Sequence, residues 1–362
     1  MRRGAGFGAR GSGNHNCRVA VLLVLLLPTV ASAAPPDSAA CPKIIEVRIL
    51  SVAGGQKSAT EERKLVRSDQ PVTLYALVRT KDTTYSDAPG RKPVPLPSAN
   101  WPAACPLLLE WRKLEADVGS YDNSHSAPPA MIDYVETAWD KGWMVTADVH
   151  PTIMHDDFKG IPHGLGSMRY RLLVDAGGRS VATPGLECRE SGALCRKIHL
   201  VAYRPDDTAL GYIHELFNTP YIYGSKTIRG GHQSDLLVGS DCADFAVYGK
   251  RRQRGKSKFE YTYTGGLPRL ASKRTPVTRG DDGTYLDRKG KTLTFGPGKE
   301  VRPGDLLNLP SGHVVVLYQD DGNGVLDDRD LVAHTLLREP EIVPLRSCRW
   351  PVHKADVLRL KE

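Results

Sequence analysis

Cysteine is scarce in this chain: 7 of its 362 residues are cysteines, too few for a fold built mainly on disulfides. Long apolar runs are absent beyond the first 33 residues, so no later segment is expected to cross a membrane as a helix. Hydrophobic residues make up 40% and charged residues 25%, which excludes disorder, collagen and coiled coil for the whole. Turn-forming residues are plentiful, with 35 glycines and 26 prolines, and they favour short strands over long helices.

Acidic residues are missing from residues 1–33, which have the three parts of a secretory signal peptide. A basic region with four arginines precedes an apolar run at 19–27, and an A-x-A site follows at 31–33. The run is shorter than the ~20 residues that span a bilayer. We therefore expect cleavage after residue 33, a secreted or periplasmic mature chain in the cell envelope, and no stable membrane insertion.

The formal net charge of +8 suggests a nucleic-acid partner, but half of it lies in the signal peptide. Without those four arginines the chain has 45 basic and 41 acidic residues, a net charge of +4. The densest basic run, residues 250–258, has no interleaved aromatic residues and is typical of a solvated loop. We expect no nucleic-acid partner, and a monomer.

Six cysteines remain after cleavage, in a compartment where disulfides persist. Cys188 and Cys195 flank a short loop that a disulfide would close, and Cys41 and Cys105 share the N-terminal region. Spacing alone does not fix the connectivity. Cys242 is expected to stay free for chemistry, and Cys348 is the candidate for a second free thiol.

The length predicts two domains, at roughly 100–200 residues each. Residues 42–204 read as a β-rich, sandwich-like domain of unknown role, because runs of Val, Leu, Ile and Tyr alternate with turn residues. Its strand candidates are 44–50, 72–78, 107–114, 143–149, 168–174 and 198–203. A boundary near Pro205 precedes a short helix at 208–217, which opens a second domain over 205–362.

Cys242 has the sequence context of a cysteine at a helix start. Asp241 is a favourable N-cap, Asp244 completes a capping-box-like pattern, and an apolar helix body follows. The exposed N–H groups and the positive end of the helix dipole would stabilise a thiolate there. A disulfide partner or a small buried residue is the alternative interpretation of the same segment.

A cysteine nucleophile needs a base, usually histidine, that a third polar group orients. His313 opens a strongly apolar strand, and His334 lies in the next one. Asn323-Gly324 between them is the preferred two-residue hairpin turn. A hairpin centred there would place the two histidines directly opposite each other, with Cβ atoms ~5 Å apart. His334 would then bond one ring nitrogen of His313 and leave the other for Cys242; two polar strand residues without a role are the alternative.

Five short motifs over about residues 206–338 resemble, in the correct order, those of the NlpC-like cell-wall cysteine peptidases. They are 219–224 (TPYIYG), 241–245 (DCADF), 303–306 (PGDL), 312–314 (GHV) and 332–334 (VAH). The resemblance implies an α+β chain in which the β-rich domain precedes a compact papain-like domain. It implies that Cys242 is the nucleophile, His313 the base and His334 the orienting residue, and that Tyr221 and Asp241 line the substrate cleft.

The implied activity is that of a peptidoglycan endopeptidase, which cleaves stem-peptide amides through a thioester intermediate and needs no cofactor. Two departures put the substrate in doubt: Ser225 replaces a glycine, and Ala243-Asp244 replaces Ser-Gly beside the nucleophile. The alternatives are an inactive envelope-binding module on the same scaffold, and a cysteine amidase or acyltransferase with a substrate other than peptidoglycan.

Residues 320–330 are rich in aspartate and resemble a calcium loop. Asp321, Asn323, Asp327 and Asp330 fall at suitable spacings, but Gln319 stands where the first loop aspartate belongs. The hairpin turn explains Asn323-Gly324 equally well.

Overall fold

The computed structural model describes residues 41–90, 92–95, 101–117, 133–141, 144–146, 149, 164–190, 193–255, 259–348 and 353–362. The expected signal peptide lies outside these residues. The chain is mostly β, with 44% strand and 11% helix in several sheets and a half-barrel. The predicted α+β fold is therefore wrong, because a papain-like α+β domain is not evident in the described residues.

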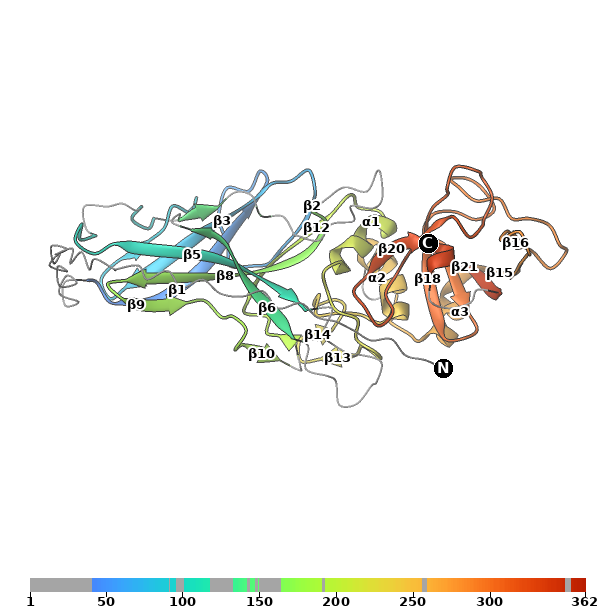
Figure 1. Ribbon diagram of the computed structural model, residues 1–362. Coiled ribbons are helices and arrows are strands. Elements are labelled where there is room, and N and C mark those ends of the chain that lie inside the picture. Colours follow the sequence, from blue (N-terminus) through green and yellow to red (C-terminus); the bar gives the residue numbers. More distant parts are fainter. Residues whose placement is uncertain are drawn as a thin grey trace, which may run out of the picture. The chain divides into compact units, whose positions relative to one another are not determined.

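Two sheets in the N-terminal half share one core (Figure 1). The first has the order β1–β3–β4, with β7 also on β3: β1 (Ile44–Ala53), β3 (Val72–Thr80), β4 (Thr84–Tyr85) and β7 (Val145–Thr146). The second has the order β2–β12–β8–β5–β6, with β9 also on β8: β2 (Lys64–Arg67), β12 (His199–Arg204), β8 (Gly166–Ala176), β5 (Leu107–Ala116), β6 (Tyr134–Lys141) and β9 (Arg179–Ala182). Leu74, Trp111 and Tyr170 are fully buried in the core between them.

Strand β12 belongs to two cores at once. Val201 and Tyr203 pack into the core of the two sheets, whereas Leu200 and Ala202 pack into the next core along the chain. This follows from the alternation of side chains along a strand, because β12 is buried on both faces. The described residues accordingly form one compact unit.

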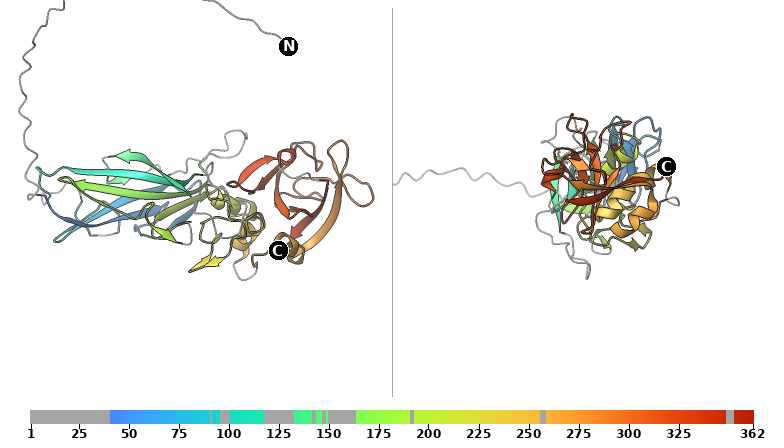
Figure 2. Two further views of the ribbon diagram at one scale, coloured as in Figure 1. Left: turned by 60° about the horizontal axis from the view of Figure 1, so that its bottom comes forward. Right: turned by 90° about the vertical axis from the view of Figure 1, so that its right-hand side faces the viewer.

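The C-terminal half contains a seven-stranded antiparallel sheet with the order β16–β15–β21–β17–β18–β19–β20 (Figure 2). Its strands are β15 (Ala271–Arg279), β16 (Tyr285–Leu286), β17 (Leu306–Leu309), β18 (His313–Gln319), β19 (Leu331–His334), β20 (Glu341–Pro344) and β21 (Lys354–Leu360). Val314 and Val316 of β18 pack on the face that α2 covers, and Val315 and Leu317 pack on the opposite face. Burial on both faces explains the continuous apolar run of β18.

The helices are short. They are α1 (Ala209–Ile213), η2 (His214–Leu216), α2 (Cys242–Arg254), η3 (Thr264–Gly266), α3 (Leu267–Leu270) and η4 (Leu345–Ser347). Two small ribbons complete the described elements: β10 (Arg189–Glu190) with β11 (Ala193–Leu194), and β13 (Thr227–Ile228) with β14 (Gly231–His232). Helix α1 lies directly against α2, because Gly249 has no Cβ to collide with the carbonyl oxygen of Ala209.

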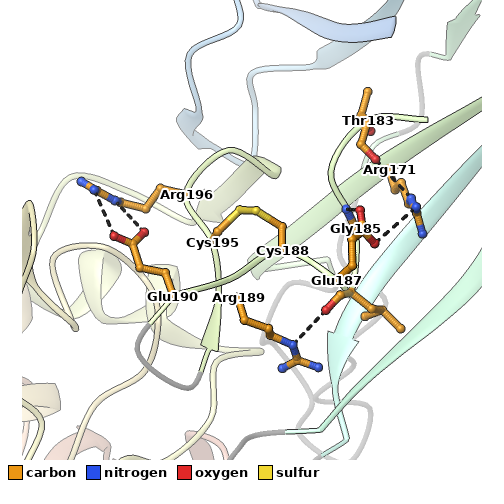
Figure 3. The surroundings of a disulfide bond; sticks show 10 residues. Arg171, Thr183, Gly185, Glu187, Cys188, Arg189, Glu190, Cys195 and Arg196 are labelled. Atoms are coloured by element: carbon orange, nitrogen blue, oxygen red, sulfur yellow. Dashed lines mark hydrogen bonds and ion pairs between the residues drawn. A yellow bond between two sulfur atoms is a disulfide. The ribbon is translucent and has the colours of Figure 1, made fainter. Parts of the chain in front are cut away.

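Both predicted disulfides are confirmed: Cys41 pairs with Cys105, and Cys188 pairs with Cys195 (Figure 3). Cys242 and Cys348 are buried free thiols. Two disulfides fit an oxidising compartment. None of the helices in the described part of the chain combines the length and apolarity that a membrane span requires.

Candidate active site

Cys242 is the first residue of α2, as its sequence context predicts. Asp241 is the N-cap in extended conformation, and its Oδ1 accepts the backbone N–H of Asp244 at 2.8 Å. The cap satisfies one of the amides that a helix start leaves unpaired. The thiol also interacts with the backbone amide of Val314, the second residue of β18. The helix start and the start of β18 therefore meet at the sulfur.

Cys242 is 7% exposed, and burial raises the pKa of its thiol to about 12. The neighbouring Asp241 charge acts in the same direction, whereas the amides of Val314 and Ala243 oppose it. The prediction of a thiolate stabilised near neutral pH is therefore wrong for the free protein. A helix start favours the thiolate only where water or a cation also solvates it.

His313 and His334 are in contact, but not in the predicted register. Val316 faces Ala333 and Leu317 faces Val332, so the pairing is shifted by two residues from the predicted one. Nε2 of His313 lies 3.3 Å from Nδ1 of His334, with ring centroids 5.3 Å apart. The contact survives because a two-residue shift keeps side chains on the same face and turns an opposite pair into a diagonal one.

The two histidines lie on the sheet face opposite the one that α2 covers. His313 faces Leu309 across β17, and Leu309 packs in the core on that opposite face. The thiol of Cys242 instead reaches β18 at the amide of Val314, adjacent to His313. The thiol of Cys242 therefore contacts the residue next to His313, at the first residues of β18.

Glu341 is a site residue that the sequence analysis missed. It faces His334 across β19 and β20, and its Oε1 lies 3.4 Å from Nε2 of His334. A carboxylate there favours the tautomer of His334 with its proton on Nε2. Nδ1 of His334 then accepts the Nε2–H of His313, which leaves the lone pair of His313 on Nδ1. Glu341 was missed because no strand was predicted at β20 (Glu341–Pro344), and only that strand places Glu341 beside His334.

Glu341→Gln is expected to lower the rate of hydrolysis about 10- to 100-fold with little change in KM, because the carboxylate no longer fixes the tautomer of His334. The ¹⁵N shifts of the imidazoles should show the proton of His313 redistributed between its nitrogens. The matched control is Glu300→Gln, which removes the same charge from an exposed ion pair with Lys291. Equal rates and unchanged tautomers in Glu341→Gln would remove Glu341 from the site.

The structure brings Tyr221 and Asp241 together beside Cys242. Tyr221 is 3% exposed and forms an isolated β-bridge with Ser240. Burial first, and then the nearby Cys242 and Asp241, raise the pKa of Tyr221. Burial also raises the pKa of Asp241, against the opposing effect of the amides that its carboxylate caps. Buried Cys242 and Tyr221 thus form one group with the half-buried Asp241.

The two departures from the family motifs contact each other. The hydroxyl of Ser225 donates to Oδ2 of Asp244 and accepts the backbone N–H of Asp241 at 3.0 Å. Nε2 of His232 lies 3.4 Å from the same Asp244 oxygen. Burial and the neighbouring Asp241 charge raise the pKa of Asp244. Ser225 and Asp244, which each replace a glycine of the family motifs, are therefore not independent changes, because together they form a new hydrogen bond.

A cavity of about 600 Å³ adjoins this interaction. Its lining includes His232, whose ring lies against that of Tyr261 with centroids 4.0 Å apart. Tyr261 donates its hydroxyl to Asp235, which Arg251 also pairs with at 2.9 Å. The wall is therefore aromatic and carries both signs of charge.

The predicted calcium ligands do not form a ligand set. Asp327 is paired with Arg329 at 2.7 Å and accepts a bond from Asn323. Both carboxylate oxygens of Asp330 accept backbone N–H groups, from Asp321 and from Asp327. Among the described residues, Asp320, Asp321 and Asp330 lie close enough to share an ion, so two of the four predicted ligands, Asp321 and Asp330, are brought together. The full predicted set does not form one calcium site, because Asp327 is paired with Arg329 and Asn323 and lies outside this group.

The prediction of a two-residue hairpin turn at Asn323-Gly324 is also wrong. Strand β18 ends at Gln319 and β19 begins at Leu331, so residues 320–330 form the connection. Aspartate side chains accept hydrogen bonds from the backbone amides of this loop; the N–H groups of Gly322 and Gly324, for example, both donate to the carboxylate of Asp320. Such side-chain bonds compete with the ladder of a tight hairpin.

Three imidazoles, the buried His199 and His313 and the half-buried His232, should make the protein sensitive to mild acid. Burial lowers the pKa of His199 and of His232 to about 4, and that of His313 to about 3. In the unfolded chain they titrate near ~6.5, so unfolding takes up protons as the pH falls. The free energy of unfolding should decrease from pH ~6.5 towards 4, by about 1.4 kcal/mol per pH unit for each imidazole. Urea unfolding at several pH values measures the free energy of unfolding. In His313→Gln this free energy should depend less steeply on pH, by the equivalent of about one proton taken up on unfolding.

No match was found among protein-family models, curated proteins or solved structures.

Proposed function

We propose that the protein is an exported cysteine hydrolase of the cell envelope that cleaves amide bonds in peptidoglycan stem peptides. The observation that supports this most is the meeting of the Cys242 thiol with β18 next to His313, whose other side contacts His334. The order of motifs resembling NlpC-like peptidases supports it too. The two disulfides are consistent with export through the expected signal peptide.

In the proposed reaction, Sγ of Cys242 attacks the amide carbonyl carbon, and its proton passes to Nδ1 of His313. The tetrahedral intermediate collapses when the amine leaves with that proton, which yields a thioester on Cys242. Water then attacks the thioester carbonyl while His313 takes its proton; the carbon–sulfur bond breaks, Sγ takes that proton back, and the carboxylic acid product is released. Amides at the start of α2 are the available donors for the oxyanion.

We place the stem peptide beside Tyr221 and Asp241, with the cavity at His232 receiving the rest of the chain. Asp241 is a carboxylate next to the nucleophile, which suits a free amino end of a peptide. Because Asp244 and Ser225 fill the position of small family residues, the accepted peptide is expected to differ from the family's own. The test is incubation of the full chain with purified muropeptides and analysis of the released products.

A second candidate function is binding of the envelope without cleavage. Two observations favour it: the pKa of the Cys242 thiol is raised to about 12, and the register places His313 on the face away from α2. A cysteine enzyme with another amide, ester or acyl substrate is the third possibility. Retention on purified sacculi without any released product would favour the binding function. A thiol that reacts with substrate but releases no muropeptide would favour the third.

A further inference from the structure

Asn308 of β17 is a buried polar residue that the proposed site does not use. It is 9% exposed, and its Nδ2 donates to the carbonyl oxygen of Thr264 at 3.3 Å. Its Oδ1 has no hydrogen-bond partner among the described residues. The carbonyl of Thr264 fixes the orientation of the amide, because a flipped side chain would turn Oδ1 towards that oxygen and lose the bond. The unpaired atom is therefore an acceptor.

Asn308 lies on the face of the C-terminal sheet that α2 covers, close to the nucleophile. It faces Val314 of β18 on one side and Asp356 of β21 on the other, and directly opposed residues point to the same face. Val314 packs with Cys242 in one core, and its amide contacts the thiol. The Cβ atoms of Asn308 and Val314 are ~5 Å apart in such a pair. Asn308 is therefore one strand away from the place where the thiol meets β18.

Neither of the two facing side chains can donate a hydrogen bond to Oδ1 of Asn308. The side chain of Val314 is apolar, and the carboxylate of Asp356 accepts bonds and pairs with Arg274 at 2.7 Å. A buried acceptor without a partner lowers the free energy of unfolding, so this asparagine destabilises the folded chain. Such a residue beside a nucleophile is expected where function requires it. The missing donor is therefore expected on a ligand.

Residues 262–266 contact Asn308 and are weakly attached to the rest of the chain. Among the described residues, the bond from Asn308 is their one hydrogen bond to a segment that does not adjoin them. Tyr263 is 68% exposed, and two glycines, Gly265 and Gly266, follow it closely. Because Cys242 is only 7% exposed, a peptide reaches the thiol only after neighbouring residues have moved. A movement of residues 262–266 would uncover Oδ1 of Asn308.

We propose that Oδ1 of Asn308 accepts a hydrogen bond from a backbone N–H of the bound peptide, once residues 262–266 have moved aside. The inference rests on the proposed function, because it lays the peptide along the line from Cys242 to Asn308. Strands are ~4.8 Å apart and an extended peptide rises ~3.4 Å per residue, so the donor lies within about two residues of the scissile carbonyl. The substrate class is a peptide with a secondary amide at that place. An ester there would leave Oδ1 unpaired.

Calorimetric titration of the full Cys242→Ala chain with synthetic stem peptides tests the inference without cleavage. In each analogue one backbone amide near the scissile bond is replaced by an ester, which removes a single N–H. We expect one replacement to weaken binding about 10-fold. The same replacement should have little effect when Asn308→Leu is also present, because the two changes remove the same hydrogen bond. Absence of binding, no weakening by any replacement, or an equal loss in both chains overturns the inference.

Asn308→Leu should also weaken binding of the unmodified peptide about 10-fold, while its melting temperature stays at or above that of the parent chain, because an unpaired acceptor is removed. Gln319→Leu is the matched control: it removes an exposed side-chain amide at the other end of β18 and should bind normally. A lower melting temperature with unchanged binding would mean that Asn308 only supports the fold, and overturns the inference. Binding that depends on Asn308, without cleavage by the wild-type chain, would support the inference and contradict the proposed hydrolase.

Discussion

Cys242→Ala is expected to abolish product release from purified muropeptides, with a loss of about 1,000-fold or more that brings the rate to background. The reason is that no other thiol lies at the start of α2 beside His313, so no thioester can form. Product release is followed by chromatography and mass spectrometry after incubation with equal amounts of the wild-type chain and the variant.

The matched control is Cys348→Ala, because Cys348 is the other buried free thiol of the chain. It should keep wild-type activity, and both variants should melt close to the wild type. Equal product release by Cys242→Ala and the wild type would contradict the proposed hydrolase. Loss of activity in Cys348→Ala, with activity retained in Cys242→Ala, would assign the nucleophile to Cys348 and not to Cys242.

Glu215→Ala is expected to cost about 3–5 kcal/mol of the free energy of unfolding. Glu215 is fully buried in η2 and pairs with Arg204 of β12 at 3.0 Å and Arg252 of α2 at 2.8 Å. Tyr248 also donates its hydroxyl to this carboxylate. Without Glu215, Arg252 loses its counter-charge, Arg204 keeps only the exposed Asp207, and this ionic link between α2 and the second sheet is lost. Chemical unfolding measures the loss.

Asp207→Asn is the matched control, because Asp207 pairs with the same Arg204 at the surface, with its side chain 54% exposed. That exposed pair should contribute less than about 1 kcal/mol. Glu215→Gln should fall between the two, since it keeps hydrogen bonds but not the charge. A Glu215→Ala variant as stable as Asp207→Asn would mean that the buried charges do not stabilise this joint.

Local features of the site could be predicted from the sequence where neighbouring residues determine them. The cap at Asp241 and the helix start at Cys242 depend on adjacent residues, and the structure confirms both. The Cys188–Cys195 disulfide closes a short loop and was also predictable. The contact of His313 with His334 was found through a wrong register, because the error of two residues preserved the face.

The fold class could not be predicted from the same signals. Strand β15 carries exposed Lys273 and Arg274 and buries only Val277, so no apolar alternation indicates a strand. It forms because β21 pairs with it from far along the chain, with Ala271 facing Leu360. Such non-local pairing overrides local propensity. The resemblance ended near residue 338 and did not include β20, where Glu341 lies.

The burial of Cys242 was missed for a similar reason. A capped helix start indicates a stabilised thiolate only if the sulfur remains solvated, and solvation depends on the packing of β18 against α2. The sequence identified the residue, whereas its raised pKa follows from tertiary packing.

The central claim, that Cys242 is the nucleophile, is tested most directly by trapping the thioester. The full chain is mixed with purified muropeptides, quenched in acid and digested, and the peptide that contains Cys242 is analysed by mass spectrometry. We expect an added mass equal to the acyl part of the cleaved stem peptide, removable by hydroxylamine and absent in Cys242→Ala. Cleaved muropeptides without any adduct on Cys242, or an adduct on another residue, would contradict it.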